Sequence, residues 1–311
     1  MNLKNFLKQN RIKLLLTGTS QNPNSLGLSL IDCAKELKIN TAAFVDTSAD
    51  YQFRFKGKST NPLNHVPDNL LVPDIETKKI YARLGMEEKN IVITGSPNYQ
   101  EILNIRAQLD EEGQKLIKKR VFNQDIQGVS IVFIDEHSNK GDKRLFLSEE
   151  YNFNGRKGMT NRNEIIASEV LDVMSGLNIK NYFIVRLHPK SDQNDYLSLG
   201  SEIDEFNSSS NYYELIYGAD LIVGMTSALL MESFLLGKEV ISIIPRDSEI
   251  EWLPPGLKEN VKCVYSAEDL TLSIKEALNN NSMKRIPDTY KEINANQKIK
   301  EFIMKEIVNY D

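Results

Sequence analysis

The chain has 311 residues, 41% of them hydrophobic and 26% charged, which is typical of a soluble globular enzyme of about two domains. Its net charge of −5 at pH 7 argues against a general nucleic-acid-binding protein. No run reaches the roughly 18 apolar residues of a membrane span, and no signal-peptide pattern precedes the first predicted strand. We therefore expect a cytoplasmic protein.

Cysteine and histidine are scarce. Cys33 and Cys263 lie far apart in the chain, in a predicted helix and a predicted strand, which argues against a disulfide framework and fits a reducing compartment. The three histidines, His65, His137 and His188, show no metal-ligand spacing. We predict neither a metal site nor a resident cofactor.

Residues 1–10 contain Leu3, Phe6 and Leu7 among lysines. This pattern predicts a short leading helix that packs on the first domain. Contact with an anionic membrane surface is the alternative, because a basic amphipathic helix can lie in a lipid interface.

The first part of the chain alternates predicted strands and helices at the spacing of a parallel, doubly wound sheet. A polar cluster that begins with Asp46 follows the second strand, at an edge where ligands bind in open α/β sheets. We predict strands at residues 13–17, 41–45, 69–72 and 91–94.

Residues 99–122 predict one long charged helix that Gly113 interrupts and could hinge. We place a domain boundary near Asn123 to Gly128, so that the first domain comprises residues 1–124.

The second predicted domain, residues 125–287, begins with a fully apolar strand. Residues 139–162 then lack apolar periodicity and are rich in Lys and Arg, as in a functional or a disordered loop. Asn161 begins a helix with a capping-box pattern. Further strands are predicted at 182–187, 221–223, 238–244 and 261–264. Residues 288–311 predict a final amphipathic helix that returns to the first domain.

The stretch from Gly218 to Gly237 predicts a strand, a tight turn and a helix. Gly224 lets the backbone turn sharply and approach another group closely. Thr226 or Ser227 caps the helix, and Gly237 ends it. Free N–H groups and two hydroxyls would converge where the helix dipole favours an anion. A plain strand-to-helix turn with a good cap is the alternative.

Three polar loops of the second domain follow strand ends. They begin at Asp135, His188 and Gly224, and the carboxyl ends of parallel strands meet at one edge of a sheet. We therefore expect one crevice. His188, followed by Pro189, comes directly after an apolar strand, where its ring could donate to a phosphate or a ribose. The alternative is that it caps the strand and packs on Pro189.

Acid–base chemistry needs a carboxylate within reach of the reacting hydroxyl. Asp135 and Glu136 are the best candidates in the second domain, and Asp46 or Asp50 is the rival in the first. Each could instead be a solvated turn residue. Glu232, six residues after Thr226, either reaches ribose hydroxyls or is a solvated helix residue.

Two segments carry a resemblance to a known family. The segment VRLHPK resembles the HP motif of bacterial sialyltransferases, and Kdo transferases and teichoic-acid glycerophosphate transferases have similar motifs. The segment GADLIVGMTSALLMESFLLGKEVISI resembles the donor-binding segment of GT-B glycosyltransferases, which have two Rossmann-like domains that face a cleft. The resemblance implies that His188-Pro189 and Thr226-Ser227 contact a cytidine nucleotide. The acidic motif of the sialyltransferases is matched by Asp135-Glu136, although His137 stands where that motif has glycine.

The resemblance implies a metal-independent, inverting glycosyltransferase of polysaccharide biosynthesis. Its donor would be a CMP-linked acidic sugar, and its acceptor a glycan or lipid-linked molecule at the inner face of the membrane. Two alternatives stay open: a sugar-nucleotide epimerase or hydrolase of the UDP-GlcNAc 2-epimerase type, and a non-catalytic nucleotide-sugar-binding subunit. Against the epimerase, Met225-Thr226-Ser227 replaces the Ser-Gly-Gly run that such enzymes normally show.

Overall fold

The structure is a computed structural model that describes residues 3–46, 49–122, 126, 128–137, 151–280, 283–291 and 294–308. Contacts within the chain divide it into two compact units: unit 1 is Met1–Glu101 with Pro287–Asp311, and unit 2 is Ile102–Ile286. Each unit contains one parallel sheet with helices, so the chain has the predicted α/β fold. A boundary between separately folding domains near residues 123–128 stays a prediction.

Unit 1 is built on four parallel strands that follow one another in the order β1-β2-β3-β4. All four strands predicted for this part of the chain are present, with ends that differ by at most a residue or two. They are β1 (Leu14–Thr17), β2 (Asn40–Phe44), β3 (Asn69–Val72) and β4 (Ile91–Ile93). Helices α2 (Leu26–Glu36) and α3 (Ile75–Arg83) connect successive strands, and short 3-10 turns lie at Tyr51–Phe53 and Glu88–Asn90.

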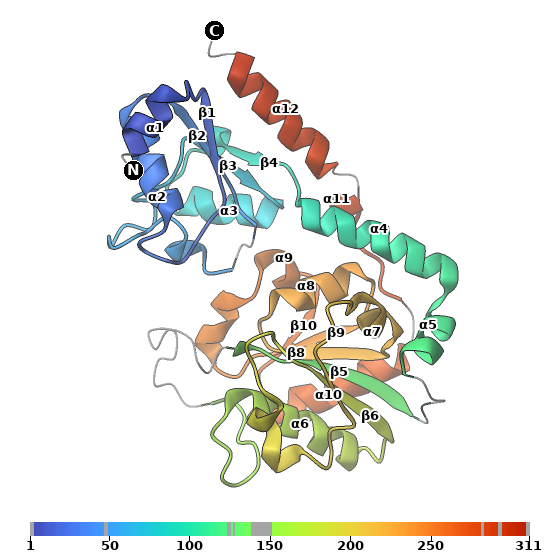
Figure 1. Ribbon diagram of the computed structural model, residues 1–311. Coiled ribbons are helices and arrows are strands. Elements are labelled where there is room, and N and C mark those ends of the chain that lie inside the picture. Colours follow the sequence, from blue (N-terminus) through green and yellow to red (C-terminus); the bar gives the residue numbers. More distant parts are fainter. Residues whose placement is uncertain are drawn as a thin grey trace. The chain divides into compact units, whose positions relative to one another are not determined.

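Both faces of the first sheet are covered, as a parallel sheet requires. Ala43 and Leu70 point to the face where α2 and α3 pack. Ala42 and Leu71, one residue out of phase with them, pack against Phe302 of helix α12 (Ala295–Val308). The C-terminal helix thus covers the first sheet, after the short helix α11 (Asp288–Lys291) (Figure 1).

The leading helix α1 (Leu3–Gln9) packs on unit 1. Leu7 is 2% exposed and contacts Ala34 and Ile39, whereas Phe6 remains 40% exposed. These contacts are those expected of the packed helix. Among the described residues, no helix is both long and apolar enough to cross a membrane.

The long predicted helix is broken where glycine interrupts it. Helix α4 (Pro97–Glu112) ends at Gly113, and α5 (Gln114–Val121) begins after it. Gly113 has φ of 90°, a conformation that glycine adopts at little cost. The sequence pattern therefore located the break, and the structure shows two helices.

Unit 2 contains six parallel strands in the order β10-β9-β8-β5-β6-β7. Two series of strands run outward from the pair β5 and β8, which is the strand order of a dinucleotide-binding Rossmann sheet. The strands are β5 (Val129–Ile134), β6 (Asn181–Arg186), β7 (Glu205–Asn207), β8 (Leu221–Gly224), β9 (Val240–Ile243) and β10 (Lys262–Val264). In such sheets, ligands bind at the carboxyl ends of the strands where the order reverses.

Helices cover both faces of this second sheet (Figure 1). Helices α6 (Arg162–Gly176) and α10 (Ala267–Asn279) pack on one face, where their apolar residues join Phe133 and Val185 in the main core. Helices α7 (Tyr213–Gly218) and α8 (Ala228–Leu235) lie on the other face. The remaining elements are 3-10 segments at Gln193–Leu199 and Asp247–Trp252 and helix α9 (Pro255–Lys258).

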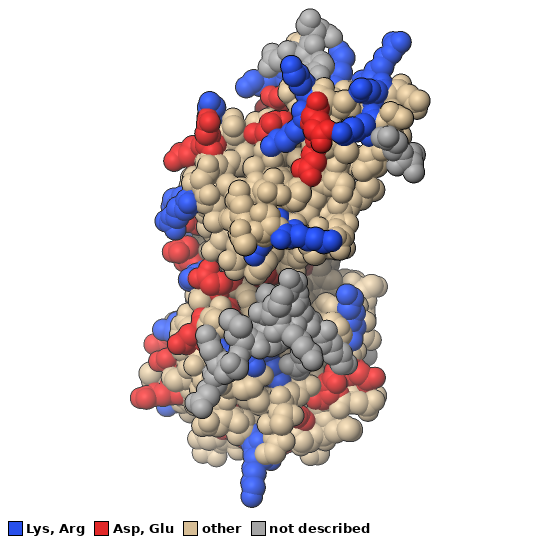
Figure 2. Space-filling view, turned by 90° about the vertical axis from the view of Figure 1, so that its left-hand side faces the viewer, with Lys and Arg blue, Asp and Glu red and all other residues tan. Residues whose placement is uncertain are grey.

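Asn161 caps α6, and its side chain accepts hydrogen bonds from the backbone N–H groups of Asn163 and Glu164. The basic loop predicted at 139–162 lies outside the described residues over positions 138–150. On the face shown in Figure 2, acidic and basic side chains lie among one another.

Candidate functional site

Three loops of unit 2 meet at the carboxyl edge of the second sheet. In the strand register Ile134 of β5 lies between Arg186 of β6 and Gly224 of β8. The residues that follow these strands therefore emerge side by side, at the point where the strand order reverses. The structure brings together the segments that begin at Asp135, His188 and Gly224.

Asp135 is a buried carboxylate whose two oxygens both have partners. It is 2% exposed, and its Oδ1 accepts a hydrogen bond of 2.6 Å from the hydroxyl of Tyr196. Its Oδ2 accepts one of 3.0 Å from the backbone N–H of His188. Burial and the Asp135 charge both raise the pKa of the Tyr196 hydroxyl, which stays protonated as the donor. Asp135 thus fastens the start of the His188 loop to the end of β5.

Glu136 joins β5 to the turn after β8. Its Oε1 accepts a hydrogen bond from the backbone N–H of Thr226, and its Oε2 accepts one of 3.0 Å from the Thr226 hydroxyl. Glu136 is 9% exposed and Thr226 8%. Because Thr226 uses its hydroxyl proton and its N–H on Glu136, its observed contacts are structural.

A buried charge network supports Glu136, and the sequence analysis missed it. Arg162, which is fully buried, donates to Glu136 at 3.0 Å and also to Glu249. Glu249 accepts a further bond of 2.7 Å from Arg246. The ring of Trp252 lies 5.7 Å from the Arg162 guanidinium. The basic residues of this part of the chain were visible in the sequence, but the pairing of Arg162 with Glu136 was not.

The network places two guanidinium and two carboxylate groups together, so the charges balance. Burial alone would lower the pKa of Arg162, but the charges of Glu136 and Glu249 outweigh it, so that the pKa is raised. A buried pair of this kind is costly to break, because one partner is left charged and unpaired. The network therefore fixes the relative positions of the β5 end, the start of α6 and the turn before α8.

His188 is held as a neutral imidazole with one donor group. Burial, and then the neighbouring His137 ring, lower the pKa of His188 below its ordinary 6.5. The two rings stack with centroids 5.5 Å apart. The Nδ1 atom of His188 accepts a hydrogen bond of 3.2 Å from the backbone N–H of Lys190, so Nε2 carries the proton in the neutral ring. Pro189 is exposed beside it.

Ser227 caps helix α8, as one of the two predicted residues. Its Oγ accepts a hydrogen bond of 3.2 Å from the backbone N–H of Leu229. The helix ends as predicted at Gly237, which has φ of 81°. The Leu229 N–H is used by the Ser227 hydroxyl and the Leu230 N–H by the Ser227 carbonyl, so what this end of α8 offers an anion is chiefly the positive end of the helix dipole.

Gly224 has a different role from the predicted sharp turn. It is not among the described glycines with positive φ. A Cβ atom at this position would lie 3.0 Å from Leu230 and 3.2 Å from the Cβ of Ile134. Glycine is thus favoured because strand β5 and helix α8 approach the backbone closely, which confirms the predicted close approach, whereas the predicted turn does not need a positive φ.

Glu232 is half-buried on α8 and accepts a hydrogen bond of 2.6 Å from the hydroxyl of Tyr212. Burial and this bond raise the pKa of Tyr212. The Tyr212 ring in turn lies 5.4 Å from the guanidinium of Arg186, which is at the end of β6. Glu232 is therefore not a solvated helix residue. No local pattern in the sequence marks Tyr212 or Arg186 as part of this group.

Asp46 belongs to unit 1, where it follows β2 and is exposed. Its Oδ1 accepts a hydrogen bond of 2.8 Å from the Thr19 hydroxyl. The other first-unit candidate, Asp50, has its pKa raised by burial. In the described part of the chain, no three His, Cys, Asp or Glu residues are grouped as a metal site would need.

Taken together, the edge offers a neutral imidazole N–H, a capped helix N-terminus and well-fixed carboxylates. The first two are groups that bind phosphate oxygens. Asp135 and Glu136, which follow the strand between β6 and β8, bond to the start of the His188 loop and to the turn before α8.

No protein-family model and no curated protein sequence matches the chain. Solved structures do match its fold. A UDP-GlcNAc 2-epimerase from Neisseria meningitidis, bound to UDP-GlcNAc, superposes with a TM-score of 0.64 at 15% identity, over 97% of this chain and 79% of that one. A UDP-N-acetylglucosamine 2-epimerase from Rickettsia bellii gives 0.63 at 14% identity, over 99% and 77%. MurG from Acinetobacter baumannii gives 0.55 at 12% identity, over 97% and 77%. These likenesses show a fold of the GT-B type.

Proposed function

We propose that unit 2 binds the diphosphate of a nucleotide sugar at the carboxyl edge of its sheet. The observation that carries the proposal is that the His188 Nε2–H donor and the Ser227-capped start of α8 lie at the same edge of the sheet. One strand separates β6 from β8, so these two groups emerge about 10 Å apart, given the usual strand spacing. A ligand with several anionic oxygens in a row can bridge that span.

The proposed substrate is a UDP-linked N-acetylhexosamine, and the proposed reaction is inversion at its C2 carbon. Support comes from the structures with the highest TM-scores quoted above, which are UDP-GlcNAc 2-epimerases, one of them bound to UDP-GlcNAc. In this proposal Asp135 and Glu136 position the binding groups, because their oxygens are already used within unit 2. Asp46, an exposed carboxylate, is kept as the candidate base.

Glycosyl transfer is the second candidate. It is favoured by the likeness to MurG and to a glycosyltransferase from Rickettsia africae, which superposes with a TM-score of 0.53 at 14% identity. The sequence Met225-Thr226-Ser227 in place of Ser-Gly-Gly also favours it. A CMP-linked donor and a glycan or lipid-linked acceptor belong to this candidate.

The test incubates the purified chain with UDP-GlcNAc in D₂O and follows the sugar by NMR. Inversion at C2 must break the C2–H bond, so an epimerase gives the C2 epimer, free or nucleotide-linked, with deuterium at C2. A transferase leaves UDP-GlcNAc intact until an acceptor is added. The Asp46→Asn variant should abolish the exchange, whereas Asp32→Asn, a carboxylate paired with His65 in the same unit, should not.

Binding is measured separately, by calorimetry with UDP, CMP, CDP and GDP. Tight binding of UDP alone supports the proposed substrate class, and preference for CMP supports the second candidate with its cytidine donor. The proposal fails if none of these nucleotides binds, or if binding survives unchanged when both His188 and Ser227 are replaced by alanine.

A further inference from the structure

A second concave site lies in unit 2, far from the strand ends that carry the candidate site. It is a cavity of about 370 Å³ bordered by the residues that precede β9 and begin β10 and by the last turns of α10. Since all six strands are parallel, this is the amino edge of the sheet. The volume falls at the lower end of the range for small-molecule pockets.

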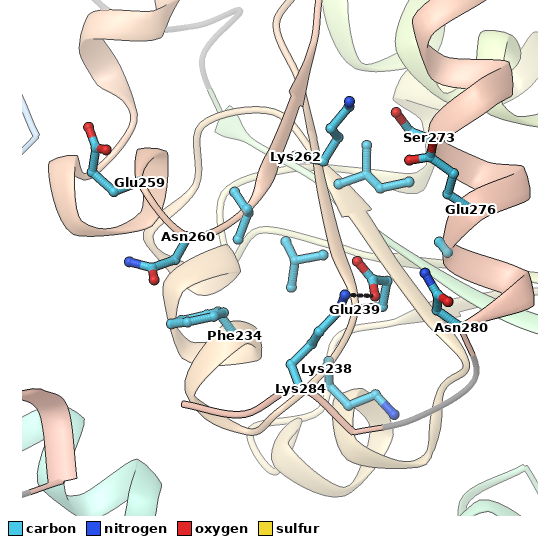
Figure 3. Close-up of a pocket in the computed structure, with 14 residues that line it drawn as sticks. Phe234, Lys238, Glu239, Glu259, Asn260, Lys262, Ser273, Glu276, Asn280 and Lys284 are labelled. Carbon is cyan, nitrogen blue, oxygen red and sulfur yellow. Dashed lines mark ion pairs between the residues drawn. The ribbon is translucent and has the colours of Figure 1, made fainter. Parts of the chain in front are cut away.

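The cavity wall is apolar over one part and polar over another. Val240 and Ile241 of β9, Val261, Phe234 and Ala277 form the apolar part. The polar part contains equal numbers of opposite charges near its centre. Figure 3 shows the ammonium of Lys284 meeting the carboxylate of Glu239 there, and this ion pair measures 2.5 Å.

Helix α10 and its C-terminal cap residue, Asn280, contribute a row of polar side chains at helical spacing. Ser273, Glu276 and Asn280 follow one another at intervals of three and four residues, so they share one face of the helix. Figure 3 shows Asn280 beside the Lys284–Glu239 pair, with Glu276 and Ser273 further along the same helix. The hydroxyl of Ser273 is buried, and it has no hydrogen-bond partner within the described residues.

The charges on the cavity wall indicate which chemical class of ligand can bind there. Three lysines on the wall are matched in formal charge by three glutamates, so neither an anion nor a cation meets an excess of opposite charge; they are Lys238, Lys262, Lys284, Glu239, Glu259 and Glu276. Carboxylates accept and ammonium groups donate, while Asn and Ser do both. A ligand with several uncharged hydroxyl groups can satisfy such a mixture, and the C–H face of a sugar ring can lie on the apolar part.

We infer that the cavity at the amino edge of the second sheet is a binding site for an uncharged sugar unit. It is separate from the nucleotide-sugar site at the carboxyl edge and does not depend on which reaction occurs there. A polymeric sugar that binds at both sites is held more tightly than at one, because binding at the first site raises its effective concentration at the second.

The probes for the test are methyl α-D-glucopyranoside and methyl N-acetyl-β-D-glucosaminide, with glucuronate and glucose 6-phosphate as their charged counterparts. Binding is measured by saturation-transfer NMR on the full chain. We expect the neutral glycosides to bind with dissociation constants of about 1–10 mM, the usual range for so small a ligand, and the charged sugars to bind more weakly.

Three single variants locate the binding. Lys284→Met and Ser273→Ala should each weaken binding of the neutral glycosides at least tenfold. Lys275→Met, an exposed lysine of α10 that does not border the cavity, should leave binding unchanged. Circular dichroism checks that each variant is folded. If Lys284→Met does not fold, Ser273→Ala still tests the inference.

The inference is overturned if no neutral glycoside binds saturably, if the charged sugars bind more tightly, or if the variants at Lys284 and Ser273 have no effect. Loss of sugar binding on replacing His188 by alanine would move the sugar to the carboxyl edge and would also overturn it. Nucleotide binding is measured on the same samples, so failure here is distinguishable from failure of the proposed function.

Discussion

Glu136 and Thr226 are 90 residues apart in the chain, yet both polar hydrogens of Thr226 point to the carboxylate of Glu136. This contact joins the end of β5 to the turn before α8, at the point where the strand order reverses. Arg162 completes it from the start of α6. The position of the α8 N-terminus is therefore set by a buried charge and not by the turn alone.

Removing the buried guanidinium should destabilise the fold. In Arg162→Met, Glu136 and Glu249 lose their shared partner inside the protein, and we expect a loss of about 3–5 kcal/mol in the free energy of unfolding. Urea denaturation of the full chain, followed by circular dichroism, measures this loss.

Arg156→Met is the matched control. Arg156 pairs with Asp172 and Glu202 at a partly exposed position, where an ion pair contributes about 1 kcal/mol or less. Equal losses for the two variants would contradict the structural role assigned to Arg162.

The cap of α8 should serve both stability and binding. Ser227→Ala removes the acceptor for the Leu229 N–H, which should cost about 1 kcal/mol of stability. It should also weaken the binding of UDP about tenfold, because the first turn of α8 is where we place the diphosphate.

Ser266 provides the comparison for Ser227. It caps α10 by the same kind of bond, accepted from the Asp269 N–H at 3.1 Å, but it follows β10, which is two strands away from β8 in the sheet. Ser266→Ala should lose similar stability and leave nucleotide affinity unchanged. If both variants weaken UDP binding alike, α8 has no special part in it.

Protonation of His188 should tighten the binding of an anionic ligand. Its pKa is lowered below 6.5, so the ring is neutral at pH 7 and gains a positive charge only in more acidic solution. The affinity for UDP-GlcNAc should therefore rise as the pH falls below about 6.5. Calorimetry between pH 5 and pH 8 measures this rise.

The His188→Gln variant keeps a side-chain N–H donor but cannot gain the charge. It should bind UDP-GlcNAc with an affinity that does not change over this pH range. His65→Gln, in unit 1, should retain the wild-type profile. A wild-type affinity that is flat with pH would remove His188 from contact with the phosphates.

Lys238 should give the stability of the protein a distinct pH dependence. The lysine is 3% exposed and donates to the Tyr217 carbonyl at 2.9 Å, and burial lowers its pKa from 10.5 to about 7. Between these two values the unfolded chain binds more protons than the folded one. The contribution of Lys238 to stability therefore rises as the pH increases from 7 to 10.5.

The Lys238→Met variant should lose this rise. Urea midpoints of wild type and variant are compared between pH 7 and pH 10. The midpoint of the wild type should rise relative to that of the variant as the pH increases. The exposed Lys275→Met variant should follow the wild type throughout. A constant difference for Lys238→Met would mean that the buried amine does not titrate in this range.

Strand positions could be predicted because short apolar runs separated by polar turns leave little choice of structure. The break at Gly113 and the end of α8 at Gly237 were likewise visible, since glycine adopts the required positive φ at little cost. For Gly224 the argument from φ failed, whereas the close approach was expected, and only the structure identifies its partners as Leu230 and Ile134.

The sequence by itself determined the α/β class, the parallel strands and the loops whose polar residues follow them, because these depend on periodicity and on neighbours along the chain. Only the tertiary structure decided what those residues do. It gave both oxygens of Asp135 and of Glu136 hydrogen-bond partners, paired Thr226 with Glu136, and placed the His188 ring and the start of α8, which we propose for binding, at the same edge of the sheet. These hydrogen bonds and ion pairs join residues that are distant in the sequence. Which residues meet depends on the order of the strands in the sheet.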